Sequence, residues 1–550
     1  MRAGGRLPGP RTSPFREDAH YPGGLTRRVI IAAITAASAG LLFGFDTGVT
    51  GGVTTMASFQ AKFFPEVYYR TTHPTPTSPY CTYDDQVLQT FNSTMYLVGM
   101  VGALIASFVT RHWGRRGVLL VGTLCFLLGG ALMAGAVNLG MLFAGRVFVG
   151  MGLGLNNSAS PLFLSEVAPA KWRGMLNTMF QFAITLGILI ASIINFGVRN
   201  MDKGWRLTLA IAEVPALALL LGLLVLPESP NSLLERGHSE RAREVLQSLR
   251  GDVDVSEEYD DLVDAVNLAN RHTLLSSFRA LFSRKFLPAA IISGTLQLFQ
   301  QFTGINAIMY YTGNLFNSIG KGRKDSLRNT VIVNAVNCGS TIVAVTGADR
   351  LGRKFLLLEG CAQMIITEVI IAIVMGVKFS NTPGLIVSEP IAQAVLAMLC
   401  LFVAGFAWSW GPLGWCIPPE INGLETRAAA QTLTVISNFL FSFVIGQSFL
   451  SMLCSMRWGV FLFFAGFNVI AAIFVIFLLP ETRGVPVERV QILLAQHPVW
   501  HGVMGAGADE IIEFETTRTT RHKQMHAEQG DAVTDVDADA KAKAASEASE

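Results

Sequence analysis

The sequence predicts an all-α membrane protein in which twelve transmembrane helices form two six-helix halves. Composition gives the first indication: of 550 residues, 51% are hydrophobic and only 15% are charged, whereas soluble domains carry about a quarter charged residues. Long apolar stretches give the second, because a helix that crosses lipid needs about 20 mostly apolar residues. Motifs that return in the second half of the chain give the third.

Twelve apolar stretches are long enough to cross a bilayer. They are Val29–Val49, Val87–Thr110, Gly117–Val137, Leu139–Phe163, Met175–Val198, Leu207–Leu226, Phe286–Ile319, Thr330–Gly347, Phe355–Val377, Ile391–Trp415, Ala428–Leu453 and Trp458–Leu479. Basic residues concentrate in the loops on one side of these spans. The positive-inside rule makes that side cytoplasmic and places both termini there.

Three charged patterns recur in the same order and on the same side of the expected membrane, which indicates that the two halves arose by duplication. A transporter built from repeats binds its substrate between the halves, near the midplane. The matched patterns are Glu166 with Arg173 and Glu420 with Arg427, Pro227-Glu228-Ser229 and Pro480-Glu481-Thr482, and Gly114-Arg115-Arg116 and Gly352-Arg353-Lys354.

The spans and loops divide the chain into five parts. We expect a cytoplasmic arm at residues 1–28, a six-helix half at 29–228 with an external segment at 58–86, a cytoplasmic helical linker at 229–285, a second half at 286–488 and a cytoplasmic tail at 489–550.

Several functional classes are excluded. The formal net charge of +2 does not indicate a nucleic-acid partner. The seven cysteines show no CxxC pair and no metal-ligand spacing with histidine, so we expect no metal and no cofactor. We also find no nucleophile–base pattern of an enzyme and no nucleotide-binding GxxxxGK[ST] motif.

Several motifs, in order, resemble the signatures of the sugar porters of the major facilitator superfamily, over about Leu25 to Glu488. A second group resembles the plant and algal monosaccharide–proton symporters. The first group is Asp349-Arg350-Leu351-Gly352-Arg353, Pro227-Glu228-Ser229-Pro230, Pro480-Glu481-Thr482-Arg483-Gly484 and Gln300-Gln301-Phe302-Thr303-Gly304-Ile305-Asn306. The second is Phe43-Gly44-Phe45-Asp46 with Gly51-Gly52-Val53, Arg111 where an acidic residue is usual, and the external Cys81.

Asp46 lies in the first span, where a carboxylate is costly and is a functional hypothesis by default. Arg146, in the fourth span, is the obvious cationic partner. The resemblance implies that Asp46 takes up the proton and that Arg146 senses its charge. The alternative is a permanent ion pair that only fixes helix packing.

Six amide side chains in apolar spans are candidate sugar ligands, because an amide both donates to and accepts from a hydroxyl. Trp415 can stack on a pyranose ring, and its glycine- and proline-containing segment weakens the tenth helix. Phe43 and Ile188 are weaker apolar candidates. The resemblance favours sugar binding over helix–helix adhesion for the set Gln181, Gln300, Gln301, Asn306, Asn337 and Asn438.

The repeated charges on the cytoplasmic side are candidates for a gate that locks the halves together and separates on inward opening. The alternative is that the arginines only set topology. The candidate residues are Glu166, Arg173 and Glu228 in the first half and Glu420, Arg427 and Glu481 in the second.

Cys81 and Cys454 are both expected to face the oxidising outer side. The resemblance implies a disulfide between them that ties an external lid to the second half. The other possibility is two free thiols.

Together these features lead us to expect a plasma-membrane symporter that carries a hexose with a proton. A facilitator without proton coupling is the nearest alternative, and Asp46 argues against it. A transporter-like sugar sensor is another, although the tail contains no recognisable interaction module.

Overall fold

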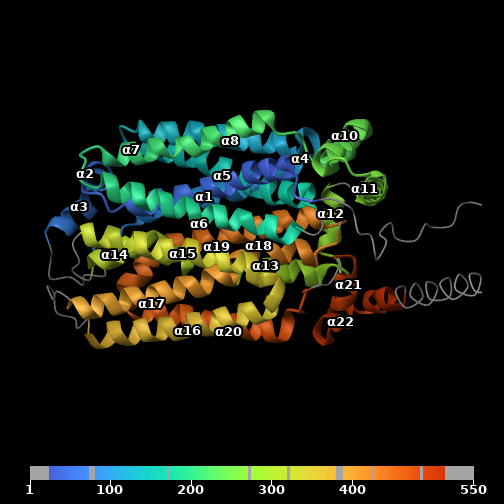
Figure 1. The fold of residues 1–550 in the computed structure, drawn as a ribbon. Coiled ribbons are helices and arrows are strands. Elements are labelled where there is room, and N and C mark those ends of the chain that lie inside the picture. The colour runs from blue at the N-terminus through green and yellow to red at the C-terminus, as the bar shows by residue number, and fades with distance from the viewer. Residues whose placement is uncertain are drawn as a thin grey trace, which may run out of the picture.

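The computed structural model describes residues 24–73, 81–169, 172–269, 274–318, 323–378, 388–423, 425–483 and 487–513. Within these ranges every regular element is a helix, and the long helices run along one common axis (Figure 1). One end of the bundle carries α2 (Ala57–Phe63) and α3 (Pro65–Thr72), and we call it the lid end. The opposite end carries the helices between the two halves, and we call it the linker end.

The first half contains six spans, but the spans and the numbered helices do not correspond one to one. Gly114, with φ 75° and ψ 178°, breaks α4 into two spans, because glycine alone adopts this conformation without strain. The sixth span is divided at Ala212. The helices are α1 (Arg27–Val53), α4 (Gln86–Ala134), α5 (Leu139–Val167), α6 (Arg173–Val198), α7 (Gly204–Ile211) and α8 (Glu213–Val225).

The second half repeats this arrangement, with its seventh and tenth spans broken near mid-membrane. The seventh breaks at Gly304, whose φ is 83°, and the tenth breaks at Ser409. The helices are α13 (Leu287–Phe302), α14 (Ile305–Ser318), α15 (Arg323–Leu351), α16 (Arg353–Lys378), α17 (Glu389–Trp408), α18 (Trp410–Ile421), α19 (Arg427–Met456) and α20 (Gly459–Leu478).

Six short helices cover the linker end. Two hydrogen bonds attach α10 to the first half: Thr26 donates to the Leu249 carbonyl at 2.7 Å, and Arg250 donates to the Val167 carbonyl at 3.0 Å. The helices are α9 (Pro230–Glu235), α10 (Ser239–Arg250), α11 (Ser256–Ala269), α12 (Leu274–Leu281), α21 (Val487–Gln496) and α22 (Pro498–Met504).

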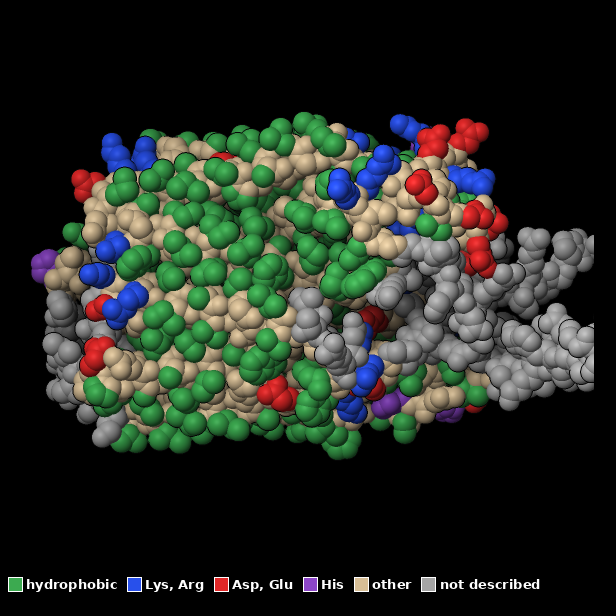
Figure 2. Space-filling view, in the orientation of Figure 1, with side chains coloured by type: hydrophobic (Ala, Val, Ile, Leu, Met, Phe, Trp, Pro, Cys, Tyr) green, Lys and Arg blue, Asp and Glu red, His purple; other side chains and the backbone are tan. Residues whose placement is uncertain are grey.

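On the face shown in Figure 2, hydrophobic side chains are spread over the middle of the molecule, and most of the charged side chains lie toward its two ends. Nine continuous helical segments of the described residues are long and apolar enough to span a membrane. The difference from the twelve expected spans has three causes: α4 contains two spans, α13 and α14 are separate short helices, and α15 is more polar. Because a helix satisfies its backbone hydrogen bonds internally, such a surface can face lipid.

The two halves meet mainly where α4 packs against α19 and where α6 packs against α15. These four helices and the broken α13–α14 and α17–α18 surround the centre of the molecule. The candidate site residues lie on them and on α1 and α5.

Candidate functional site

Asp46 and Arg146 form a buried ion pair between α1 and α5. Arg146 Nη1 donates to Asp46 Oδ2 at 2.8 Å and to Oδ1 at 3.0 Å, and Arg146 Nη2 donates to the hydroxyl of Thr50. Asp46 is 2% exposed and Arg146 is 0% exposed. The guanidinium also lies 4.2 Å from the centre of the Phe91 ring. Two unit charges in such surroundings hold each other strongly, because water does not screen them.

Close packing of α1 on α6 holds Asp46 in place. Gly44, two residues before Asp46, contacts the backbone of Ile184, and any side chain there would collide with that backbone. Gly48 makes a similar contact with Ile188. The glycines therefore let α1 approach α6 closely enough to bury the polar face of α1.

An aromatic lid covers the ion pair at the lid end. Phe59 of α2 packs against Phe91, with ring centres 5.7 Å apart, and against Trp205 at 5.7 Å. The disulfide between Cys81 and Cys454 is present and joins the lid segment to α19 of the second half. The lid rings therefore cover the Phe91 ring that contacts Arg146, which limits the access of water from this end.

Four of the predicted amides form one hydrogen-bonded network in the second half. Asn438 Nδ2 donates to Gln300 Oε1 at 2.8 Å, Gln301 Nε2 donates to Gln300 Oε1 at 3.1 Å, and Asn306 Nδ2 donates to Gln301 Oε1. Gln297, which we did not predict, completes the network by accepting from Asn438 at 2.7 Å.

The breaks in the seventh and tenth spans position this amide network. The turn at Gly304 brings Asn306 of α14 beside Gln301 of α13. The break at Ser409 begins α18, and Gln300 Nε2 donates to the backbone carbonyls of its first two residues, Trp410 at 2.9 Å and Gly411 at 3.0 Å. A hydroxylated ligand that accepts hydrogen bonds from these amides would therefore replace hydrogen bonds that Gln300 donates to the backbone of α18.

The remaining predicted ligands lie outside the amide network. Gln181 of α6 lies near Gly411 across the interface between the halves, and Trp415 packs its indole against Phe180, with ring centres 5.8 Å apart. Asn337 of α15 lies 3.7 Å from the Met309 sulfur, and its Oδ1 has no hydrogen-bond partner among the described residues.

The two apolar candidates lie in the packed interior. The Phe43 ring lies 6.4 Å from Tyr96 and 6.0 Å from Phe439, so Phe43 contacts helices of both halves. Ile188 is buried on α6 beside α1.

Hydrogen bonds also join the halves at the lid end. The hydroxyls of Tyr96 in α4 and Tyr310 in α14 lie 2.6 Å apart, and Tyr310 donates to Thr47 Oγ1 at 3.4 Å. Asn92 donates to the Tyr311 hydroxyl at 3.1 Å. Our sequence analysis missed these tyrosines, because a tyrosine in an apolar span has no distinctive signal.

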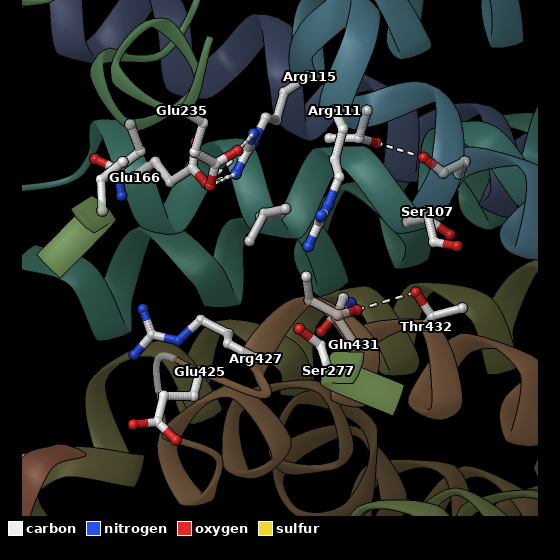
Figure 3. Close-up of a pocket in the computed structure, with 17 residues that line it drawn as sticks. Ser107, Arg111, Arg115, Glu166, Glu235, Ser277, Glu425, Arg427, Gln431 and Thr432 are labelled. Atoms are coloured by element: carbon white, nitrogen blue, oxygen red, sulfur yellow. Dashed lines mark hydrogen bonds and ion pairs between the residues drawn. The ribbon is translucent and has the colours of Figure 1, made fainter. Parts of the chain in front are cut away.

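A cavity of about 250 Å³ lies between the halves at the linker end (Figure 3). Arg111, Arg115 and Glu166 line it from the first half, while Arg427 and Gln431 line it from the second. With hydrogen bonds joining the halves at the lid end and this cavity between them at the linker end, the molecule opens toward the linker end.

The charged residues of the candidate gate make ion pairs within each half. In the first half, Arg115 lies 2.8 Å from Glu166 and also pairs with Glu235. Glu228 accepts hydrogen bonds from the backbone N–H groups of Arg115 at 3.1 Å and Arg116 at 3.2 Å. Burial opposes the ionisation of Glu235, but the Arg115 guanidinium prevails and lowers the pKa of Glu235.

The second half repeats the pattern. Arg353 pairs with Glu420 at 3.1 Å, and Glu481 accepts from the backbone N–H groups of Arg353 at 3.1 Å and Lys354 at 3.0 Å. Arg427 lines the cavity. The side chain of Arg173 lies outside the described residues. Our sequence analysis left out Arg115 and Arg353 because it treated the basic loops as topology signals.

Comparisons with known proteins decide the family. Residues 32–494 match the family described as "Sugar (and other) transporter". H(+)/hexose cotransporter 2 of Parachlorella kessleri is 49% identical over 531 residues, which cover 96% of this chain and 98% of that protein. Sugar transport protein 7 of Arabidopsis thaliana is 46% identical over 503 residues, covering 91% and 97% of the two chains.

The chain belongs to the sugar transporter family. The major facilitator fold expected from the sequence is confirmed as well. A solved structure of the proton:xylose symporter XylE of E. coli, bound to 6-bromo-6-deoxy-D-glucose, shares the fold with a TM-score of 0.72. It is 24% identical and covers 86% of this sugar transporter and 100% of its own chain. The family is one of transporters rather than enzymes.

Proposed function

We propose that this protein is a hexose–proton symporter that works by alternating access. The observation that carries the proposal is the buried Asp46–Arg146 pair, because a sugar carrier without proton coupling needs no carboxylate there. Relatives named H(+)/hexose cotransporter, about half identical to this chain over nearly its full length, support it.

The Asp46 carboxylate is the proton carrier of the proposal. When ionised, Asp46 holds Arg146 and thereby joins α1 to α5. Protonation removes the negative charge, so Arg146 loses its strongest partner and α1 can move relative to α5. The lid protects this exchange from water, which strengthens the coupling.

The amide network is the proposed sugar site. Gln300, Gln301, Asn306 and Asn438 already exchange hydrogen bonds with one another, so a sugar hydroxyl can replace an amide partner at little net cost. Trp415 supplies a ring face for the pyranose. Gln181, Asn337, Phe43 and Ile188 complete the proposed surroundings from α6, α15 and α1.

The linker end is the cytoplasmic end in this proposal, with both termini on that side of the plasma membrane. Arg115, Arg116, Arg353 and Lys354 lie there, as the positive-inside rule requires. The disulfide lies at the opposite end, where an oxidising compartment preserves it. The structure is then inward-facing, and the ion pairs of Arg115 with Glu166 and of Arg353 with Glu420 each lie within one half at that end.

Energetics fit a one-proton mechanism. A proton that moves inward through about 100 mV releases about 2.3 kcal/mol. Since about 1.4 kcal/mol corresponds to a factor of ten, one proton sustains a sugar gradient of order tens.

Radiolabelled glucose uptake tests the proposal in cells that lack hexose transport. We expect uptake against a gradient at acidic external pH, a fall at alkaline pH and loss with a protonophore. Asp46→Asn should abolish accumulation and leave at most equilibration. Wild-type uptake that only equilibrates and ignores pH would identify a facilitator instead.

A matched control is Asp509→Asn, since Asp509 is a largely exposed carboxylate on the surface at the linker end. It should leave accumulation and its pH dependence unchanged. Equal surface expression of the three proteins separates a transport defect from a folding defect.

A further inference from the structure

One edge of the interface between the halves is tied together at the lid end, and we call it the pinned edge. It is formed by residues 81–93, which lead into α4 and make up its first turns, and by residues 447–454 of α19. The disulfide joins Cys81 to Cys454 and holds their Cα atoms 4.5 Å apart. No other disulfide joins the halves, because the remaining five cysteines are free.

Hydrogen bonds continue the pinned edge along both helices. Ser451 of α19 donates to Asp84 Oδ1 at 2.7 Å. Gln447, one turn earlier in α19, accepts from the Ser93 hydroxyl at 2.6 Å and donates to the Thr90 hydroxyl at 3.1 Å. These bonds all cross from the first half to the second, so the two helices are held together over several turns.

The polar residues of the pinned edge recur at helical spacing. Side chains at positions i, i+3, i+4 and i+7 share one face of a helix, so each helix presents one polar face to the other. The residues are Gln86, Gln89, Thr90 and Ser93 on α4 and Gln447, Ser451 and Cys454 on α19. Gln86 and Gln89 both donate to the Ser451 hydroxyl, at 3.0 Å and 3.1 Å.

The segment between Cys81 and α4 is itself held by hydrogen bonds. The Asp84 N–H donates to the Cys81 carbonyl at 3.1 Å, and Arg70 of α3 donates to the Asp84 carbonyl at 2.7 Å. Asp85 caps α4 by accepting from the Leu88 N–H at 2.8 Å. An unrestrained chain could extend by about 3.5 Å per residue, and these bonds oppose that extension. The disulfide therefore holds the start of α4 beside α19.

The opposite edge of the interface has a different construction. There α1 and α6 of the first half meet α14 and α15 of the second, and we call this edge the seam. Asn334 of α15 donates to Ser192 of α6 at 2.5 Å. On α1, a Cβ atom added to Gly51 would lie 3.2 Å from the Met309 carbonyl oxygen and 3.1 Å from that of Tyr310. A bare glycine and small polar side chains therefore close the seam.

A cavity of about 10 Å³ lies within the seam, with walls from α1, α6, α14 and α15. This is about the volume that one water molecule needs. Asn195 of α6 lines the cavity and is 1% exposed. Its Nδ2 donates to the Gly48 carbonyl at 2.9 Å, but its Oδ1 has no partner among the described residues. The closed seam thus contains an acceptor that a water molecule or a sugar hydroxyl can use.

The two edges respond differently to a separation of the halves. Bodies that are joined along one edge rotate about that edge, and their displacement grows with distance from it. At the pinned edge, separation is opposed by the disulfide and breaks the hydrogen bonds of Gln447 and Ser451. At the seam, separation uncovers glycines and small polar groups that water can hydrate.

We propose that opening at the lid end is one-sided: the pinned edge is a pivot that stays closed, and the seam opens as the entrance for the sugar. Gly51 is then a positioning residue that lets the seam close, and the polar lining of the small cavity becomes a wall of the entrance. The proposal rests on the alternating access of the proposed function but does not depend on proton coupling.

Chemical cross-linking tests which edge must open for transport. After replacement of the five free cysteines, one variant carries Ser192→Cys and Asn334→Cys across the seam. Its matched control carries Gln86→Cys and Ser451→Cys across the pinned edge. A short bismaleimide should lower glucose uptake by the seam variant by about tenfold or more, because transport needs both conformations. The same reagent should leave uptake by the control variant unchanged, with peptide mapping to show that both cross-links form.

The outcomes separate this inference from the proposed symport. Loss of uptake in the cross-linked control variant would overturn the pivot, and so would full uptake in the cross-linked seam variant. Each variant without the reagent shows the effect of its substitutions alone. Wild-type uptake that ignores pH would instead overturn the symport and leave the comparison of the two edges intact.

Spin-label distances give a readout that does not depend on transport. Labels at Ile193 and Ile332, both exposed beside the seam, report on the seam. Labels at the exposed Val87 and Ser455 report on the pinned edge. Gly51→Leu places a side chain against the backbone of α14, so the seam cannot close. The distance across the seam should lengthen in this variant, and the distance across the pinned edge should stay as in wild type.

The matched control for the distance measurement is Gly197→Leu, because a Cβ atom added to Gly197 of α6 meets open space. Both distances should then match those of wild type. Equal lengthening of both distances in Gly51→Leu would show that the halves separate along the whole interface. No change in either distance would show that Gly51 does not hold the seam closed. Either result contradicts the inference.

Discussion

The two halves share a fold and a repeat, but they hold different chemistry. The first half contains the buried ion pair of Asp46 and Arg146. The second half contains the neutral network built on Gln300 and Asn438. Besides the packing of α4 on α19 and of α6 on α15, the lid disulfide and the hydroxyls at the lid end connect the two halves.

This difference teaches how a duplicated fold can couple two substrates. In the proposed mechanism, the proton carrier Asp46 lies in the first half and the amide network lies in the second, so neither needs to contact the other directly. Coupling then depends on the relative position of the halves, which each site biases through its own contacts. Changes confined to the amide network should therefore alter the dependence of uptake on sugar concentration, whereas changes at the Asp46–Arg146 pair should alter its dependence on pH.

Arg146→Leu should have the largest effect, because it leaves the Asp46 charge buried and unpaired. Removal of one partner of a buried pair costs about 3–5 kcal/mol of folding stability. Thermal unfolding in detergent measures this loss. The double variant with Asp46→Asn should recover most of the stability but accumulate no sugar. If Arg146→Leu alone is as stable as wild type, groups other than Arg146 stabilise the Asp46 carboxylate.

Loss of the disulfide should lower the folding stability less than Arg146→Leu does, but it should affect both halves. Replacement of Cys81 and Cys454 by serine should lower stability by about 2–4 kcal/mol, since the bond closes a loop across a sequence separation of 373 residues. Thermal unfolding with and without a reductant measures it, and Cys125→Ser, which changes a free cysteine, is the control. Reductant sensitivity that persists in the double serine variant would point to another cause.

Asn438→Ala should weaken sugar binding without altering proton dependence. It removes the two hydrogen bonds that Asn438 donates, at 2.7 Å to Gln297 and at 2.8 Å to Gln300, and of these two acceptors Gln300 Oε1 keeps a donor in Gln301. A loss of about 1–3 kcal/mol corresponds to a roughly 5- to 150-fold higher KM. The exposed Gln393→Ala is the control. A shift in the pH midpoint of Asn438→Ala would break the division between the halves.

The fold was largely predictable because apolar length and repeated motifs are local properties of the chain. Helix continuity was not: Gly114 separates the two expected spans of α4 with hardly any loop between them, while Gly304 divides one expected span into α13 and α14. Asp46 and Arg146 could be paired because charges in apolar spans are few. Gln297 was missed although it has the same amide signal as its neighbours.

Ion-pair partners were the least predictable part. Glu166 and Glu420 were noted as repeated acids, but their pairing with Arg115 and Arg353 depends on how loops fold back on helix ends. Whether such charges pair within a half or across the interface also depends on the conformation, which a sequence does not specify.

Tyr310→Phe should have the smallest effect and tests the link between the halves at the lid end. It removes the hydroxyl that lies 2.6 Å from Tyr96 and 3.4 Å from Thr47. One such hydrogen bond contributes about 0.5–1.5 kcal/mol, so the population open at the lid end should rise by up to about tenfold. Electron-resonance distances between spin labels at the exposed Val137 and Val377, after replacement of the five free cysteines, report this population.

The matched control for that experiment is Tyr69→Phe, because Tyr69 lies exposed on α3. It should leave the distance distribution unchanged. Tyr96→Phe should copy Tyr310→Phe, since either change removes one of the two hydroxyls. If Tyr310→Phe keeps the wild-type distribution, the hydroxyl pair does not hold the halves together, and closure at the lid end depends on the packing of α1 and α4 against α14 and α19.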